Sequence, residues 1–334
     1  MRERLLGLLE DSDDRFVSGE LLSRQLGVSR TAVWKQIRKL EDEGYTIEAS
    51  RKLGYRLRGR PDQLTLPGLL TKLRTETFGK RIKLLDAVDS TQNVAQQLAE
   101  EGAPEGTLVI AEQQLHGRGR MGRSWISPKG KGVWMSFILR PSIPLPFTPQ
   151  LTLLAAVALC RSLRRLTGLD IGIKWPNDLL VGGKKISGIL LESSAEEERL
   201  KYVIAGVGIS LNLDASDYSP DMLAKAVSLK LAAGRPFDRS ETIAEFLHEF
   251  EELYRLYGQE GFDPIRTLWE ALSVSIGKPC VLTTPQGLVI EGSPVGLAET
   301  GALLVKREGG KVVPVFSADM GMTQERDQPA DRVQ

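Results

Sequence analysis

The sequence of 334 residues has few of the residues that cross-link a fold or bind transition metals. Its only cysteines are Cys160 and Cys280, and its only histidines are His116 and His248. Cys160 lies in the apolar run 151–163, which predicts a buried helix, so two buried, reduced thiols are favoured over a disulfide. A zinc site is not expected from so few His and Cys residues. These absences indicate a reducing, cytoplasmic environment.

A net charge and a long apolar run are also absent. The 44 Lys and Arg residues nearly balance the 43 Asp and Glu residues, which leaves a formal charge of +1. The molecule as a whole therefore does not attract DNA or an anionic membrane, and nucleic-acid binding must be local. No uncharged stretch reaches the ~18 residues of a membrane span, and the start MRER has no signal-peptide core. We expect a soluble protein of two or three domains without membrane contact.

Residues 18–57 predict a winged helix-turn-helix. Two helices are expected to begin at the N-cap residues Ser18 and Ser29, with a glycine turn between them. The second helix has a buried stripe at helical spacing, formed by Val33, Ile37 and Leu40. Residues 45–48 and 55–57 alternate like two short strands. This order of elements is typical of a winged helix-turn-helix, whose second helix enters the major groove of DNA.

The same segment carries a local surplus of positive charge. Residues 29–60 include nine Lys or Arg and four Asp or Glu, as phosphate contacts require. An ordinary pair of solvated amphipathic helices is the alternative, and the order of cap, turn, stripe and hairpin favours DNA binding. The candidate DNA-binding residues are Ser29, Arg30, Thr31, Trp34, Lys35, Arg38, Arg51 and Lys52. Residues 58–62, with Pro61, are expected to be a linker.

Beyond the linker, helix and strand signals alternate irregularly, which predicts an α+β domain. Strands are expected at 82–87, 107–111, 132–139, 171–174, 186–192 and 202–209, and helices at 90–101, 151–163, 221–233 and 241–257. From residue 277, short apolar runs separated by turn residues predict a small β-barrel. The polar residues 324–334 are expected to be a disordered tail.

The stretch HGRGRMGRSW, residues 116–125, is the most unusual in the chain. Residues 117–122 fit G-x-G-x-x-G, but a dinucleotide-binding turn must open a helix, and here SPKGKG and a predicted strand follow. A P-loop is also excluded, because no Ser or Thr follows Lys185. What remains is a glycine-rich loop whose guanidinium groups suit a carboxylate or a phosphate. We expect it to become ordered on ligand binding, the alternative being a solvated basic loop.

Three further stretches carry polar residues: DSTQ (89–92), KWPND (174–178) and GKKISGILLE (183–192). Each alone has an ordinary explanation as a helix cap, a turn or a hairpin tip. Together with GRGRMGR and with GVGISLN (206–212), in this order, they resemble the bacterial bifunctional biotin–protein ligases, also called biotin operon repressors. The resemblance covers essentially the whole chain. GRGR and KWPND in combination are its specific part.

The resemblance implies an α+β multidomain fold. It consists of an N-terminal winged helix-turn-helix (1–62), a central mixed-sheet α/β catalytic domain of the biotin ligase and class II synthetase-like type (63–274), a C-terminal small SH3-like β-barrel (275–323) and the tail (324–334). It also implies a reaction in which biotin and MgATP form biotinyl-5′-adenylate, and a lysine of the biotin carboxyl carrier protein of acetyl-CoA carboxylase then takes the biotin. Such chemistry needs two anions held together and phosphate charge neutralised, without an enzyme nucleophile.

The residues at positions that match the family's motifs are implied to have the family's roles. The catalytic residues are Arg118, Arg120 and Lys185. The biotin site comprises Ser90, Thr91, Gln92, Gln114, Arg118, Gly119, Arg120, Lys185 and Gly188. The nucleotide is implied to contact Arg123, Trp125, Asn177, Asp178, Ser210 and Asn212, with Asp178 as a Mg²⁺ ligand and no tightly bound metal. Met121 replaces an arginine of some members and has no charge role, and His116 is expected on the loop surface.

The resemblance further implies regulation by the adenylate. The adenylate-bound form is implied to be a homodimer through its central sheet, and to bind operator DNA of biotin-synthesis genes. The same surface is implied to meet the carrier protein. Two alternatives remain open. A biotin-sensing regulator without ligase activity would not need Arg118, Arg120 and Lys185, and a related lipoate-type ligase is disfavoured by the motif set.

Overall fold

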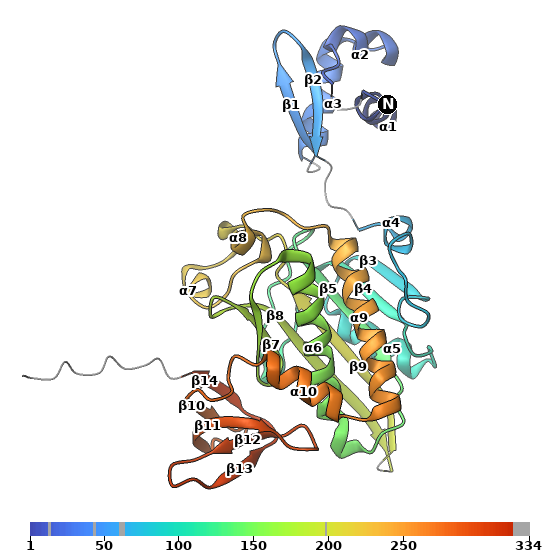
Figure 1. Cartoon of the computed structure of the whole chain (residues 1–334). Helices are drawn as coiled ribbons and strands as arrows, with labels where there is room; N and C mark the ends of the chain where they lie inside the picture. The colour runs from blue at the N-terminus through green and yellow to red at the C-terminus, as the bar shows by residue number, and fades with distance from the viewer. Residues whose placement is uncertain (13–14, 43–44, 60–63, 198, 323–334) are drawn as a thin grey trace, which may run out of the picture. The chain divides into compact units, whose positions relative to one another are not determined.

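The computed structural model describes residues 1–12, 15–42, 45–59, 64–197 and 199–322. The chain divides into two compact units, Met1–Gln63 and Leu64–Gln334 (Figure 1). Of the expected linker, residues 58 and 59 belong to a strand of the first unit, which corrects that boundary, and residues 60–62 lie outside the described residues. The expected tail, 324–334, also lies outside them.

The described residues of the first unit form three helices and an antiparallel hairpin. They are α1 (Arg2–Glu10), α2 (Gly19–Leu26), α3 (Arg30–Asp42), β1 (Thr46–Ser50) and β2 (Gly54–Gly59). The Ser18 hydroxyl accepts a hydrogen bond from the Leu21 N–H, and Gly27 ends α2 with a left-handed φ of 67°. The predicted stripe of α3 is buried, which confirms the helix-turn-helix. Helix α1, which sequence reasoning missed, contributes Leu5 and Leu9 to the same core.

The second unit is built on a mixed seven-stranded sheet with the order β3-β4-β5-β9-β8-β7-β6. Strands β3 and β4 are parallel, and the other neighbouring pairs are antiparallel. The strands are β3 (Ile82–Val88), β4 (Leu108–Gln114), β5 (Val133–Leu139), β6 (Ile171–Lys174), β7 (Asp178–Val181), β8 (Lys184–Glu196) and β9 (Arg199–Ile209). This mixed pairing confirms the α+β class and the central mixed sheet.

Helices cover both faces of this sheet. Figure 1 shows α6 (Thr148–Thr167), α9 (Arg239–Glu260) and α10 (Asp263–Leu272) over one face. Helix α5 (Thr91–Glu100) covers the other. Successive residues of a strand point to opposite faces, and accordingly Leu108 and Ile110 pack in the large core whereas Val109 packs against α5. Short helix α4 (Leu66–Leu70) lies near the start of the unit. Both cysteines are buried and unpaired, as expected.

The helix expected over 221–233 is wrong in part. The structure has two short helices, α7 (Pro220–Leu223) and α8 (Leu229–Ala233). Between them the backbone pairs with β8: the Lys185 N–H donates to the Lys225 carbonyl at 2.8 Å and the Val227 N–H to the Lys185 carbonyl at 2.9 Å. This pairing with a distant strand interrupts the helix. Pairing of this kind is invisible to helical periodicity.

The C-terminal strands form one antiparallel sheet with the order β13-β12-β11-β10-β14. They are β10 (Cys280–Thr283), β11 (Val289–Leu297), β12 (Leu303–Lys306), β13 (Val312–Val315) and β14 (Asp319–Met322). The predicted run of short strands is confirmed. Closure into a barrel is not, because the end strands β13 and β14 are not paired with each other in the described part of the chain. Across the described ranges, no helix has the length and hydropathy to cross a membrane.

Candidate active site

A cavity of about 750 Å³ in the second unit brings the polar motifs together. Residues from 90–92, 118–126, 174–178, 185–190 and 206–210 line it. Residues of the segment 218–226 and of strands β10 and β14 also contribute to its walls. Motifs that are up to about a hundred residues apart in sequence therefore share one concave site, as a small-molecule site requires.

One end of the cavity is lined by a chain of neutral hydrogen bonds. The backbone N–H and the hydroxyl of Thr91 donate to Gln114 Oε1 at 2.9 and 3.1 Å. Gln114 Nε2 donates to Ser127 Oγ at 2.9 Å, and the hydroxyls of Thr91 and Ser136 lie 2.8 Å apart. Each of these side chains is held by its neighbours. The cavity end is therefore a preorganised set of donors and acceptors without formal charge.

Gln92 fills the wall beside this chain, with its amide already occupied. Its Nε2 donates to the carbonyls of Leu190 at 3.3 Å and Ile204 at 3.1 Å, and its Oε1 accepts from Ser136 Oγ at 3.0 Å. Both amide hydrogens are thus used by the protein backbone, and only acceptor capacity remains. A Cβ on Gly206 would lie 2.5 Å from Gln92 Oε1, so this close packing requires glycine. Gln92 mainly holds strands β8 and β9 in place.

Lys185 is oriented from two sides. Its Nζ forms an ion pair with Asp178 Oδ1 at 2.6 Å, and it lies over the Trp125 ring, 5.2 Å from the centroid. A Cβ on Gly188 would lie 3.2 Å from Lys185 Nζ and 3.1 Å from Trp125, so glycine leaves room for both. Asn177, beside Asp178, donates from Nδ2 to the Ile189 carbonyl at 2.6 Å. The ammonium group is therefore fixed at the cavity wall.

The arginine-rich loop forms a compact hairpin. The Trp125 N–H donates to the Gly117 carbonyl at 2.8 Å and the Gly119 N–H to the Arg123 carbonyl at 2.7 Å. The short helix η1 (Arg120–Gly122) forms the tip. Arg118 leaves the hairpin to pair with Glu192 of β8, at 2.9 Å.

The other two arginines of this loop contact the C-terminal sheet. Arg120 donates to Ser317 Oγ at 3.0 Å and, at 3.4 Å, to Asn177 Oδ1. Arg123 forms an ion pair with Asp319. Burial lowers the pKa of the Arg120 guanidinium, while the carboxylates of Asp319 and Asp178 act in the opposite direction. An arginine remains charged under these conditions, so the cavity holds fixed positive charge.

An aromatic wall faces these cations. Trp134, Leu213 and Tyr218 form a small apolar cluster with Trp125 packed against it. The rings of Trp125 and Trp134 are 6.5 Å apart, edge to face. Trp125 Nε1 is buried and has no hydrogen-bond partner among the described residues. The apolar wall would suit the face of a planar ring.

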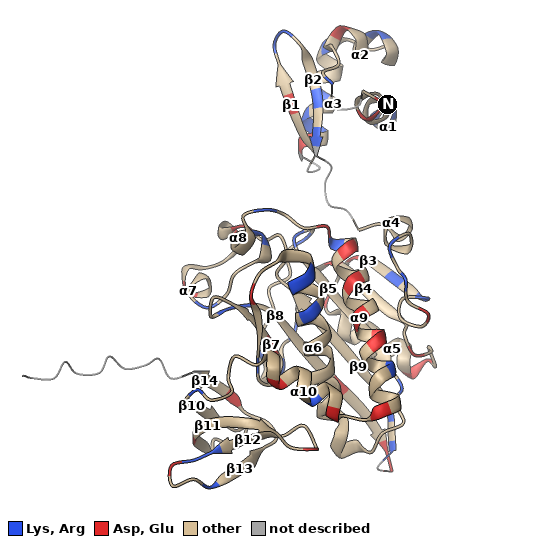
Figure 2. Ribbon diagram, viewed as in Figure 1, with Lys and Arg blue, Asp and Glu red and all other residues tan. Residues whose placement is uncertain are grey.

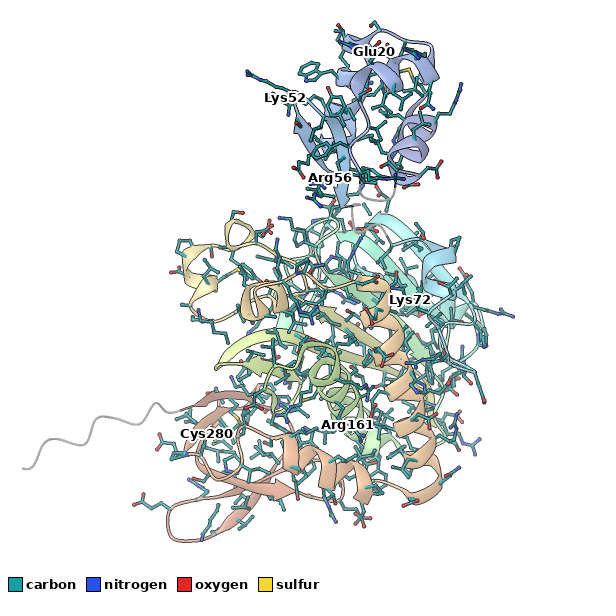
Figure 3. All side chains as sticks on the ribbon, turned by 45° about the horizontal axis from the view of Figure 1, so that its top comes forward. Glu20, Lys52, Arg56, Lys72, Arg161 and Cys280 are labelled. Atoms are coloured by element: carbon teal, nitrogen blue, oxygen red, sulfur yellow. The ribbon has the colours of Figure 1, made fainter. Side chains whose placement is uncertain are left out.

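The first unit presents the predicted DNA-binding residues at its surface. All eight are exposed, from Ser29 to Lys52. Trp34 is 48% exposed and Arg38 stacks on its ring at 5.6 Å, so an aromatic and a cation lie together on α3. Figure 2 shows positive charge at the turn of the β1–β2 hairpin, and Figure 3 shows Lys52 pointing away from the helices there. Helix α3 and the hairpin turn thus both present exposed basic side chains.

Part of the positive surplus of this unit is neutralised internally. Glu48 on β1 pairs with Arg56 and with Arg58 of β2, both at 2.7 Å. These two hydrogen bonds lower the pKa of the Glu48 carboxyl. Arg56 and Arg58 of β2 therefore connect the two strands of the hairpin. On α3, Arg30 likewise pairs with Glu20 at 2.7 Å and Arg38 with Glu41 at 3.1 Å, so part of the charge of that helix is also neutralised within the unit.

Some relatives match nearly the whole of this chain, and others match only part of it. It is 45% identical over 320 residues to the bifunctional ligase/repressor BirA of Bacillus subtilis (strain 168), covering 96% of this chain and 98% of that protein. The chain belongs to the family of bifunctional biotin–protein ligases and repressors. It is also 32% identical over 243 residues to a biotin--[acetyl-CoA-carboxylase] ligase of Paracoccus denitrificans, covering 71% of this chain and 100% of that protein.

Family models and a solved structure agree. The HTH domain matches residues 2–56, the biotin/lipoate A/B protein ligase family 84–210, and the biotin protein ligase C terminal domain 275–321. The biotin protein ligase from Aquifex aeolicus in complex with biotin and ATP superposes with a TM-score of 0.63 at 29% identity, over 74% of this chain and 100% of that one. The protein is thus a biotin protein ligase with a helix-turn-helix repressor domain.

Most of the ligase residues predicted from sequence line the cavity. They are Ser90, Thr91, Gln92, Gln114, Arg118, Gly119, Arg120, Arg123, Trp125, Asn177, Asp178, Lys185, Gly188 and Ser210. Asn212 is not among them. Its Nδ2 donates to the Phe237 carbonyl at 2.8 Å and its Oδ1 accepts from the Phe237 N–H at 2.9 Å, so its amide ties two segments together. His116 is exposed and lies 3.1 Å from Asp89, as expected of a surface histidine.

Sequence reasoning missed the residues that the ligase's C-terminal sheet brings to the cavity. Val281, Thr283, Asp319 and Met320 line it, and Ser317 contacts Arg120. Their local sequences carry no motif, and the alternation of a short strand says nothing about which distant loop it will meet. The wall segment 218–226 was missed for the same reason.

Proposed function

We propose that this ligase makes biotinyl-5′-AMP from biotin and MgATP and transfers the biotin to a lysine of the biotin carboxyl carrier protein of acetyl-CoA carboxylase. We further propose that the adenylate-bound homodimer represses biotin-synthesis genes by binding their operator. The cavity carries the first proposal, because neutral hydrogen-bonding groups, a cluster of cations and aromatic side chains line the same cavity. These three kinds of surface complement biotin, phosphate and adenine.

The neutral end of the cavity suits an uncharged urea ring. Thr91, Gln114 and Ser136 offer both donors and acceptors without a formal charge. Ser90, the N-cap of α5, lies beside them. A cyclic urea has two N–H donors and one carbonyl acceptor, which this set can match. We assign the ureido ring of biotin to this end, with Gln92 as a support.

The cations suit the carboxylate and the α-phosphate. In the first half-reaction the biotin carboxylate attacks the α-phosphorus and pyrophosphate leaves, so negative charge builds up on phosphate oxygens. Lys185, Arg118 and Arg120 are assigned to neutralise it, with Arg123 on the nucleotide side. In the second half-reaction the amine of the acceptor lysine attacks the acyl carbon and AMP leaves. The enzyme itself forms no covalent bond, because the biotin carboxylate and the acceptor lysine supply the two nucleophiles.

We treat Mg²⁺ as part of the nucleotide substrate. Within the described ranges, no group of three or more His, Cys, Asp or Glu side chains could hold a metal ion. Asp178, the expected Mg²⁺ ligand, forms the 2.6 Å ion pair with Lys185. Mg²⁺ commonly binds through substrate phosphates and one or two carboxylates. We therefore propose that Asp178 positions Lys185, and that the phosphates supply most of the Mg²⁺ ligands.

The aromatic wall is assigned to adenine, which a substitution at Gly208 tests. A Cβ at this position would lie 2.5 Å from Trp125 Nε1 and 2.6 Å from its Cε2. Overpacking of this kind costs ~1–3 kcal/mol, so Gly208→Ala is expected to raise the KM for ATP by about tenfold and to change the KM for biotin little. Gly258→Ala is the control, because a Cβ there meets nothing within 4 Å. An unchanged KM for ATP would remove adenine from this wall.

The sheet edge supports the homodimer. Strand β8 pairs with β7 only through Lys184–Gly188, and its later residues up to Glu196 pair only with β9 among the described strands. Such an edge is a ready partner for the same edge of a second copy. Glu192 on this edge pairs with Arg118 of the arginine-rich loop. We propose that ordering of the loop by the adenylate acts on the edge through this pair.

Finer features of the architecture are also proposals. We assign the domains to 1–62, 63–274 and 275–323, and the central one to the class II synthetase-like type. The C-terminal sheet is assigned to the SH3-like barrels, since β11 pairs with β10 and then β12 and has a bulge between Pro294 and Gly296. Operator DNA and a carrier protein as partners support a cytoplasmic location.

Mass spectrometry tests the ligase reaction. The protein is incubated with MgATP, biotin and a biotin-carrier domain, and the acceptor is examined for one biotinyl addition at one lysine. Lipoate in place of biotin distinguishes the related acyl-adenylate ligases. No modified acceptor under any condition would refute the reaction and favour a regulator that only senses biotin. Modification with lipoate but not with biotin would show that the protein is a lipoate-type ligase.

DNA binding by α3 is tested through its salt dependence. Lys35 is exposed on the helix beside Trp34 and Arg38. If it contacts a phosphate, Lys35→Ala is expected to weaken binding to a short DNA duplex and to reduce the slope of log K against log salt by about 1. Fluorescence anisotropy at several salt concentrations measures both the affinity and the slope. Lys80→Ala, exposed in the second unit, is the control, and equal slopes for the three proteins would exclude the contact.

A further inference from the structure

Two side chains of the C-terminal sheet contact the arginine-rich loop from nearly two hundred residues away. Ser317 Oγ accepts a hydrogen bond from Arg120 Nη2 at 3.0 Å, and Asp319 forms the ion pair with Arg123. Ser317 lies between β13 and β14, and Asp319 begins β14. Both contacts are at the tip of the loop, around η1, whereas the base of the loop is closed by its own backbone hydrogen bonds.

The segment that holds these two side chains is anchored in the C-terminal sheet. Ala318, between them, is fully buried, and Asp319 is in register with Thr283 of β10. The C-terminal sheet is in turn fixed on the catalytic domain. Glu270 of α10 accepts from the Leu297 N–H at 2.9 Å, and Gln150 of α6 donates to the Glu299 carbonyl at 2.6 Å. The loop tip is therefore attached to a support that is independent of the loop.

Asp319 acts on both arginines. It pairs directly with Arg123, and its charge also favours the protonated form of the buried Arg120 guanidinium. Without Ser317 and Asp319, the described contact left to the Arg120 guanidinium is the long one to Asn177, at 3.4 Å. The Arg123–Asp319 pair is largely exposed, so it adds little to the stability of the fold. Its loss is expected to free the loop tip and leave the fold intact.

We propose that Ser317 and Asp319 are a latch: positioning residues that hold the tip of loop 116–128 over the cavity and keep the adenylate bound between the two half-reactions. This inference rests on the proposed adenylate chemistry. The adenylate is a mixed anhydride that water destroys once it leaves the site. A loop held from a separate domain keeps it enclosed, while the backbone hydrogen bonds at the loop base preserve the loop shape.

The test compares adenylate release from full-length variants. Each protein is loaded with labelled biotin and MgATP, so that the adenylate forms. It is then diluted into excess unlabelled biotin, and the released biotinyl-AMP is followed by chromatography. Asp319→Asn is expected to release the adenylate about fivefold faster than the wild type, and the double variant Ser317→Ala/Asp319→Asn faster still. Asp319→Glu is expected to restore slow release. Glu308→Gln, an exposed carboxylate of the same sheet, is the matched control.

A second measurement distinguishes loss of the latch from a general destabilisation of the fold. Trypsin cleavage after Arg120 or Arg123 in the adenylate-bound protein is expected to accelerate in Asp319→Asn, with an unchanged Tm. Should Asp319→Asn unfold the C-terminal sheet, Ser317→Ala, which removes one hydroxyl, carries the comparison. Wild-type release and cleavage rates in the folded variants would overturn the latch. A wild-type protein that forms no adenylate would instead refute the proposed function, and the latch with it.

Discussion

Lys185→Ala is expected to slow formation of biotinyl-5′-adenylate by about 10²–10³-fold, the usual loss when one preorganised donor to a developing charge is removed. The Nζ of Lys185 is held by Asp178 and Trp125 at the cavity wall, so alanine removes a positioned charge from the site. The fold is expected to persist, because the strand pairing of residue 185 uses only its backbone. Pyrophosphate release in a single turnover measures the rate, and circular dichroism checks the fold.

Lys184→Ala is the matched control for this prediction. Lys184 is the preceding residue of β8, and its Nζ donates to the Leu223 carbonyl at 2.6 Å, away from the cavity lining. Its loss is expected to change the rate of adenylate formation by less than about fivefold, the effect of one ordinary hydrogen bond. Near-normal rates for Lys185→Ala would remove this lysine from the phosphate role. Equal losses in both variants would indicate a disturbed strand.

Glu112→Ala is expected to lower the free energy of unfolding of the second unit by about 3–5 kcal/mol. Glu112 binds the Arg239 guanidinium through two hydrogen bonds, at 2.7 and 3.2 Å, and also accepts the Leu64 N–H at 3.0 Å. The Arg239 side chain is 0% exposed and that of Glu112 12% exposed. Alanine therefore removes a carboxylate and two hydrogen bonds from a buried guanidinium.

Urea unfolding followed by tryptophan fluorescence measures this loss, since four of the five tryptophans lie in the second unit. The control is Glu252→Ala, which removes the exposed partner of Arg255 and is expected to cost less than about 1 kcal/mol. Equal midpoints for the two variants would contradict a stabilising role for the buried pair. A loss at Glu112 that Glu112→Gln largely restores would assign the effect to hydrogen bonding more than to charge.

Elements with strong local signals were predicted well. The caps Ser18 and Ser90 and the stripe on α3 depend on neighbours within a few residues, and all of them are confirmed. Elements whose ends depend on distant partners were predicted poorly. Residues 225–227 pair with β8 in place of continuing a helix, and β7 and α10 carried no signal strong enough to be recognised.

The residues of the cavity also differ in whether the sequence alone could place them. Motif resemblance selected Lys185 and Arg120 from their specific order along the chain, and both line the cavity. It placed Asn212 there too, but the structure directs that amide to the backbone of Phe237. Two Asn rotamers differ by little energy, so the packed surroundings decide between them.

By itself, the sequence determined the family, the α+β class, the helix-turn-helix and the identity of the cations, since each is recorded in local order or in residue type. The loop HGRGRMGRSW was recognisable as a candidate anion-binding loop on the same grounds. Only the tertiary structure decided that Asp178 holds Lys185, that Gln92 has no free donor, and that Ser317 and Asp319 hold the loop tip. The first depends on the register of the adjacent strands β7 and β8, and the other two join distant segments or depend on which hydrogen bonds are already used. Such choices are made by packing of the whole chain, and no periodicity or motif encodes them.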